Sequence, residues 1–241
     1  MRGRYDFFMK TAVVIFTFPR DFDLAKRAAA SVRDNWTRTG FETPTVFFVV
    51  HAKDLDAARS ALPKEQILTH RFNAGGTLRY SEAIHGMRGI YRSIFAAPEK
   101  FDALLKVDSD TILLRPECFT NPLRDSGCGF VAVRRYAVDS TTLGNAAKDK
   151  PVPNLCNGCV YLLARDAFAA IDSCPPAAID AAIHVANGHE DLFFSRVATA
   201  HDAVVFSLID KRLAVFDLDK QTRNEQTVYI HCPVAEKGTG K

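Results

Sequence analysis

The stretch DALLKVDSDTIL, residues 102–113, decides the fold. Its first half, 102–107, is a largely apolar run of strand length, and the acidic turn Asp108-Ser109-Asp110 follows at once. A second apolar run over 111–114 comes directly after the turn. A short run of this kind, rich in Leu and Val, predicts a strand buried on both faces, as in a parallel sheet that helices cover. We therefore expect two carboxylates at the carboxyl end of a buried strand.

Strand and helix patterns alternate in the chain before this stretch. Strands are expected at 12–18, 45–50 and 66–70, and helices with one apolar face at 22–36, 54–62 and 79–96. Such alternation predicts βαβ units and a parallel sheet. Gly86 and Gly89 lie off the apolar stripe of the last helix and would weaken it unless another group packs closely there.

The order changes after the acidic turn. Strands at 111–114 and 128–135 follow with no long helix expected between them. Further strands are expected at 159–163, 203–207, 212–216 and 227–231, and helices at 166–172, 176–186 and 190–198. We predict an α/β single domain over 1–241, with a parallel nucleotide-binding half (about 10–115), a mixed-sheet acceptor half (about 116–235) and a flexible tail, 236–241.

Composition narrows the class of protein. The chain has 241 residues, of which 47% are hydrophobic and 24% charged, the balance of a globular domain. Its 31 basic and 28 acidic residues are interspersed, with no basic stripe, which argues against a nucleic-acid partner. No apolar run approaches the ~20 residues that span a bilayer. Peripheral membrane contact and the oligomeric state stay open.

In a chain of this size the six cysteines do not indicate a disulfide scaffold, so we interpret them as reduced thiols of a cytoplasmic protein. Cys156 and Cys159 have the spacing of half a zinc knuckle or of a redox pair. No second pair completes a zinc set, and the segment has a strand pattern. Buried small side chains are therefore the favoured interpretation.

The acidic turn carries the strongest chemical signal. Ligands of open α/β sheets bind at the carboxyl ends of the strands, where Asp108 and Asp110 are expected. A hard divalent cation takes oxygen ligands and bridges carboxylates to phosphates. The competing interpretation is a plain turn, because Asp and Ser are common turn residues. The apolar strands on both sides favour a functional turn.

Val107-Asp108-Ser109-Asp110 between apolar strands resembles the D-x-D motif of GT-A fold glycosyltransferases, and the order of elements resembles theirs over nearly the whole chain. The resemblance implies a Rossmann-like GT-A fold in which Asp108, Ser109 and Asp110 bind Mn²⁺ or Mg²⁺ and the diphosphate of a nucleotide sugar. A UDP-sugar is the favoured donor. It also implies that the nucleoside pocket begins at Thr17 and Phe18, where the first strand ends.

Two downstream segments extend the resemblance. Residues 157–163 resemble the strand that lines the sugar and acceptor region, with Asn157 as the contact residue and Cys159 where glycine is common. Residues 188–194 resemble the acidic start of a helix behind the reaction centre. There Asp191 is the first candidate for a general base and Glu190 the second. Carboxylates at a helix start also cap the helix and match its dipole.

Three more side chains complete the predicted site. His231 ends a late strand and resembles the histidine that joins the two aspartates at the metal of several GT-A families. Lys237 follows it at the spacing of a diphosphate-binding lysine, although Val234 replaces the glycine expected between them. Arg79 follows a glycine pair just before the helix at 79–96, and a guanidinium pairs well with phosphate.

Together these features predict a metal-dependent glycosyltransferase of the hexosyltransferase class with an unknown hydroxyl acceptor. The acidic pair 190–191 favours inversion and the spacing from His231 to Lys237 favours retention, so the stereochemistry stays open. One alternative is a sugar-phosphate nucleotidyltransferase, which would carry a Gly-rich loop after the first strand, whereas residues 18–22 hold no glycine. The other is a non-catalytic protein that binds nucleotide sugars.

Overall fold

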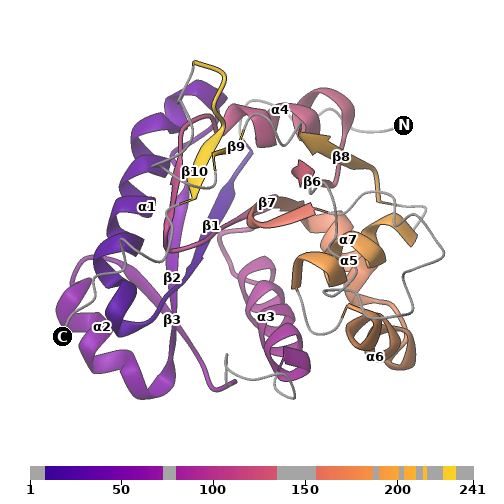
Figure 1. The fold of residues 1–241 in the computed structure, drawn as a ribbon, viewed down its shortest axis with the longest axis horizontal. Coiled ribbons are helices and arrows are strands. Elements are labelled where there is room, and N and C mark those ends of the chain that lie inside the picture. The colour runs from indigo at the N-terminus through magenta and orange to yellow at the C-terminus, as the bar shows by residue number, and fades with distance from the viewer. Residues whose placement is uncertain are drawn as a thin grey trace.

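The structure is a computed structural model that describes residues 9–72, 80–134, 156–186, 190–200, 204–209, 214–215 and 225–231. A seven-stranded sheet in the order β3-β2-β1-β4-β7-β6-β8 forms its centre (Figure 1). The strands are β1 (Thr11–Phe16), β2 (Thr45–His51), β3 (Gln66–His70), β4 (Ala103–Val107), β6 (Phe130–Arg134), β7 (Cys156–Ala164) and β8 (Phe206–Ile209).

The sheet is mostly parallel. β3, β2, β1 and β4 run parallel to one another, β7 is antiparallel to both β4 and β6, and β8 is parallel to β6. Val13, Val14, Leu104 and Leu105 of the two central strands are fully buried, which explains the near-continuous apolar runs. The α/β class predicted from the sequence is confirmed.

Helices cover both faces of the sheet, and the strand order reverses beside β1. α1 (Phe22–Asn35) and α2 (Leu55–Ala61) lie on one face as the chain moves from β1 outward to β3. α3 (Tyr80–Phe95) lies on the other face and returns the chain past β1 to β4 (Figure 1). Right-handed crossovers place α1 and α2 on one face because the chain moves outward there, and α3 on the other face because the chain returns. The ends of β1 and β4 therefore flank a topological switch point.

The second half adds α5 (Arg165–Asp172), α6 (Pro176–Val185) and α7 (Glu190–Ala200) on the side of α3 (Figure 1). A second sheet, in the order β5-β10-β9, joins distant parts of the chain. Its strands are β5 (Thr111–Leu113), β9 (Ala214–Val215) and β10 (Tyr229–His231). No helix in the described ranges is both long and apolar enough to cross a bilayer.

A ten-residue helix, α4 (Glu117–Ser126), lies between β5 and β6, where the sequence predicted no long helix. That expectation is wrong. Pro122 falls inside the helix, and an internal proline normally argues against one. Its apolar face nevertheless buries Phe119 and Leu123, and Gly127 ends the helix with the left-handed φ of 65° that glycine adopts without strain.

Close packing explains one of the two glycines in α3. A Cβ at Gly86 would lie 1.9 Å from the ring of Phe72, so only glycine fits beneath that ring. A Cβ at Gly89 would meet nothing within 4 Å. Gly86 therefore lowers the helix propensity of α3 but allows close contact between α3 and the segment after β3.

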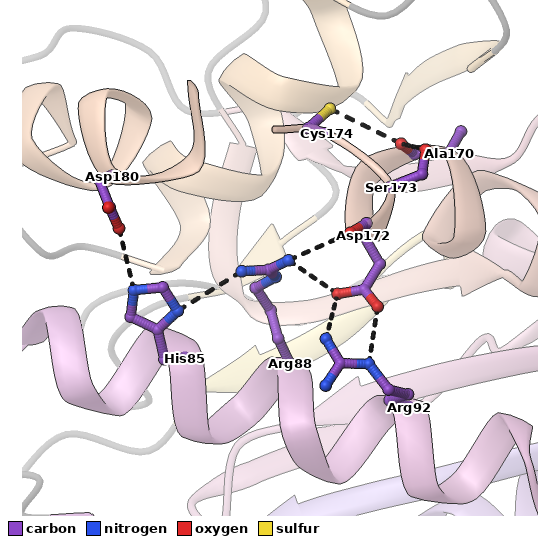
Figure 2. A network of polar contacts seen from close by, with 8 residues as sticks. All are labelled: His85, Arg88, Arg92, Ala170, Asp172, Ser173, Cys174 and Asp180. Carbon is purple, nitrogen blue, oxygen red and sulfur yellow. Dashed lines mark hydrogen bonds and ion pairs between the residues drawn. The ribbon is translucent and has the colours of Figure 1, made fainter. Parts of the chain in front are cut away.

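An ion-pair cluster attaches α3 to α5. Asp172, at the end of α5, accepts hydrogen bonds from Arg88 (2.8 Å) and Arg92 (2.8 and 2.9 Å) of α3, as Figure 2 shows. Burial alone would raise the pKa of Asp172, but the two guanidinium groups lower it below its usual value. His85 of α3 also lies 3.2 Å from Asp180 of α6. Polar contacts therefore join α3 to two helices of the second half.

Candidate metal and active site

The acidic turn is fixed at the carboxyl edge of the central sheet. The Asp108 carbonyl accepts a hydrogen bond from the Thr111 backbone N–H (3.1 Å), which closes a tight turn between β4 and β5. The Asp108 backbone N–H donates to the carbonyl of Cys159 on β7 (2.8 Å). Both backbone bonds hold the turn in place, so its side chains start from fixed positions.

Strand β10 brings His231 to this turn. Because β10 pairs antiparallel with β5, His231 lies opposite Thr111. Its Nδ1 atom is 3.3 Å from Oδ1 of Asp110 and 3.2 Å from the hydroxyl of Thr111. The side chain of Asp110 is 6% exposed. A buried carboxylate beside one ring nitrogen orients an imidazole and leaves its other nitrogen for a metal ion.

Asp108, His231 and Cys159 form a group of three potential metal ligands. Their ligand atoms all lie within 4.8 Å of one another. A carboxylate, an imidazole and a thiol in that space fit a divalent transition-metal ion. Asp108 and His231 were predicted as ligands from the sequence, whereas Cys159 was not. The predicted ligand Asp110 lies beside His231.

Lys106 is the central site residue that the sequence prediction missed. Its ammonium lies 2.6 Å from a carboxylate oxygen of Asp108, 2.6 Å from one of Glu190 and 2.5 Å from the carbonyl oxygen of Gly158. Its side chain is 5% exposed. Burial lowers the pKa of an amine, but the two carboxylates outweigh it and hold the pKa of Lys106 well above its usual value. Lys106 is therefore a permanent cation between Asp108 and the start of α7.

Two tyrosines extend this polar cluster into the core. Lys106 lies over the ring of Tyr161, 5.7 Å from its centroid, and the Tyr161 hydroxyl is 2.7 Å from that of Tyr91 on α3. Burial, followed by the charge of Glu190, raises the pKa of Tyr91, so its hydroxyl stays protonated. Side chains of β4, β7, α3 and α7 therefore support one acidic turn.

The ends of the first three strands form the other side of this edge. Thr17, directly after β1, is buried, and its backbone N–H bonds to the Val49 carbonyl (3.0 Å). Phe18 follows and is 36% exposed, as an aromatic face available to a ligand would be. At β3, the ring of His70 stacks on Phe72 with centroids 3.8 Å apart. Burial, then the charge of His51, lowers the pKa of His70 to about 4.

The structure brings Asp108, Asp110, His231 and Glu190 to one edge. Ser109 is buried within the turn. Asn157 lies in β7 and Asp191 in α7, but their side chains are outside the described part of the chain. Arg79 and Lys237 lie outside the described residues altogether. The roles of these four residues stay predictions.

Comparison with known proteins identifies the kind of fold. No known family profile and no curated protein sequence matches this chain. Its fold matches that of mouse xyloside xylosyltransferase 1 in the apo form, with a TM-score of 0.57 over 92% of this chain and 97% of that chain, at 14% identity. This likeness shows that the two chains share an α/β fold. Since 360 chains of known structure match, it defines a fold and not a substrate.

Proposed function

We propose that this chain is a metal-dependent glycosyltransferase that moves a sugar from a nucleotide-diphosphate sugar, with UDP-sugars favoured, to a hydroxyl acceptor. The observation that carries the proposal is the meeting of the acidic turn 108–110 with His231 and Glu190 at the topological switch point. The fold supports the same class of reaction, because the matching mouse enzyme is a xylosyltransferase that acts on xylosides.

Asp108 and His231 would hold the cation, and Asp110 would orient His231 through Nδ1. The sequence resemblance implies Mn²⁺ or Mg²⁺. A bound cation supplies Lewis-acid stabilisation of the negative charge that develops on the departing nucleoside diphosphate. Lys106 keeps Asp108 and Glu190 in fixed positions before the donor arrives.

The donor would extend from the metal towards the end of β1. The exposed ring of Phe18 offers a stacking surface for the nucleobase, and Thr17 lies beside it. Arg79 and Lys237 are proposed partners of the diphosphate, and Asn157 is proposed to line the sugar. In an inverting reaction Glu190 or Asp191 takes the proton of the acceptor hydroxyl as its oxygen bonds to the anomeric carbon. A retaining reaction needs no base at that position.

The test measures release of nucleoside diphosphate from a panel of nucleotide sugars, with and without Mn²⁺, together with transfer to hydroxyl acceptors. Asp108→Asn and Asp110→Asn should each lower the turnover by ~100-fold, because one negative charge of the site is lost. Asp102→Asn is the matched control: Asp102 lies at the opposite end of β4, where it accepts a hydrogen bond from the Lys10 backbone. Its turnover should equal that of the wild type.

Three outcomes would overturn the proposal. If metal-dependent turnover is unchanged in Asp110→Asn, the site does not take part in the reaction. Release of pyrophosphate from a nucleoside triphosphate and a sugar phosphate would make the protein a nucleotidyltransferase. Tight binding of a nucleotide sugar, measured by thermal shift, without turnover on any acceptor would make it a binding protein.

A further inference from the structure

We infer that Cys159 is a ligand of the metal in the proposed site, so that the ion is held by a carboxylate, an imidazole and a thiolate. The inference rests on the proposed function only for the role of the ion, because the three side chains define the site by themselves. It departs from the sequence interpretation, in which Cys159 was a buried small residue. It also assigns a role to the position where the family resemblance expects glycine.

The register of the sheet places Cys159 beside Asp108. Val107 pairs with Val160 in the antiparallel ladder of β4 and β7, and the next residue outward, Asp108, bonds to the carbonyl of Cys159. Directly opposed residues point to the same face of a sheet. The thiol therefore lies on the face that carries the Asp108 carboxylate.

The third ligand comes from an independent part of the chain. His231 reaches the site only through the pairing of β10 with β5, yet its ring lies within 4.8 Å of both the thiol and the carboxylate. In a tetrahedral zinc site neighbouring ligand atoms are ~3.3 to 3.6 Å apart, from bond lengths of ~2.0 to 2.3 Å. The three side chains would therefore move closer together when an ion binds. Among the described residues, no other group of three such ligands comes together.

The donor set determines which ions the site prefers. A thiolate is a soft ligand that selects Zn²⁺ and similar ions, whereas Mg²⁺ prefers oxygen. On binding, the metal–sulfur bond replaces the S–H bond and the proton leaves to solvent. Three protein ligands leave positions open for the oxygens of a diphosphate, as in catalytic zinc sites. We therefore expect Zn²⁺ and Co²⁺ to bind through sulfur and Mg²⁺ to bind weakly.

The experiment uses Co²⁺ as a spectroscopic probe of the full chain after treatment with a chelator. A cobalt–thiolate bond gives a strong charge-transfer absorption in the near ultraviolet, which oxygen and nitrogen ligands do not give. The wild type should show this band, and added Zn²⁺ should displace the Co²⁺ and remove the band. Cys159→Ser and Cys159→Gly should abolish the band and weaken Zn²⁺ binding by more than about tenfold. Cys174→Ser, at a half-buried cysteine after α5, is the matched control and should keep both.

Circular dichroism and thermal melting verify that each variant is folded, and the serine and glycine variants test the same bond with different packing. Co²⁺ binding without the band, or full Zn²⁺ affinity in a folded Cys159→Ser variant, would overturn the inference. The two proposals fail separately. A cobalt–thiolate band in a protein that turns over no nucleotide sugar would leave this inference standing alone. Sugar transfer with the same metal dependence in Cys159→Gly would leave only the proposed function.

Discussion

Replacing Lys106 by methionine removes the ammonium that separates Asp108 from Glu190 and keeps most of the side-chain volume. Each carboxylate lies 2.6 Å from the Lys106 nitrogen, so the variant leaves two negative groups within ~5 Å of each other. At an effective dielectric constant of about 20 they repel by ~3 kcal/mol. Removing one partner of a buried ion pair costs ~3 to 5 kcal/mol.

We expect the lower end of that range, because the side chains of Asp108 and Glu190 are 34% and 28% exposed and water screens them. The free energy of unfolding in urea, measured with a chelator present, should fall by ~3 kcal/mol. For a chain of this size the melting temperature should fall by ~6 to 12 °C.

Lys26→Met is the matched control. Lys26 forms an ion pair with Asp23 at 2.9 Å, a comparable distance, but both side chains are exposed. Such a pair contributes less than ~1 kcal/mol. If Lys106→Met loses no more stability than Lys26→Met, the two carboxylates do not hold Lys106 as a buried cation, and its role in positioning Asp108 fails with it.

Two further predictions concern packing and pH. Gly86→Ala puts a methyl group 1.9 Å from the ring of Phe72 and should lower the free energy of unfolding by ~1 to 3 kcal/mol. Gly89→Ala meets nothing and should raise it by up to ~1 kcal/mol. Equal changes in urea unfolding for the two variants would contradict the packing. The pKa of His70 falls from 6.5 to about 4 on folding, so between these values the unfolded chain binds a proton that the folded chain does not. Stability should therefore fall as the pH falls through this window, and less so in His70→Phe; identical urea midpoints against pH for both proteins would exclude a neutral His70.

The sequence predicted individual strands and most helices well, but not which strands pair with one another. The run at 45–50 predicted β2 because β-branched and aromatic residues favour strands, and a short apolar run of them fits a buried strand. The position of β10 between β5 and β9 depends on pairing across more than a hundred residues, and no local pattern contains it. α4 was not predicted. Its sequence contains Pro122, which disfavours a helix, but burial of Phe119 and Leu123 stabilises it.

In the candidate site, too, residues with a local signal were predicted and long-range contacts were not. The acidic turn and His231 have local signals, a strand end in each case, and they do come together. Lys106 also had a signal, since a charge within an apolar strand must find partners and lies on the same face as Asp108 two residues later. Glu190 was itself a candidate site residue, but its pairing with Lys106 could not be predicted. The start of α7 reaches β4 only through the packing of the second half.

The attachment of α3 to α5 has a consequence for how the chain divides. A fragment that ended at residue 115, the boundary of the predicted nucleotide half, would contain Arg88 but not Asp172. The guanidinium of Arg88, 9% exposed, would lose its carboxylate, and β4 would present an open edge where β7 now pairs. The parts before and after residue 115 therefore complete each other's core and ion pairs. We expect a fragment ending there to fold less well than the whole chain, so expression trials should keep the two parts together.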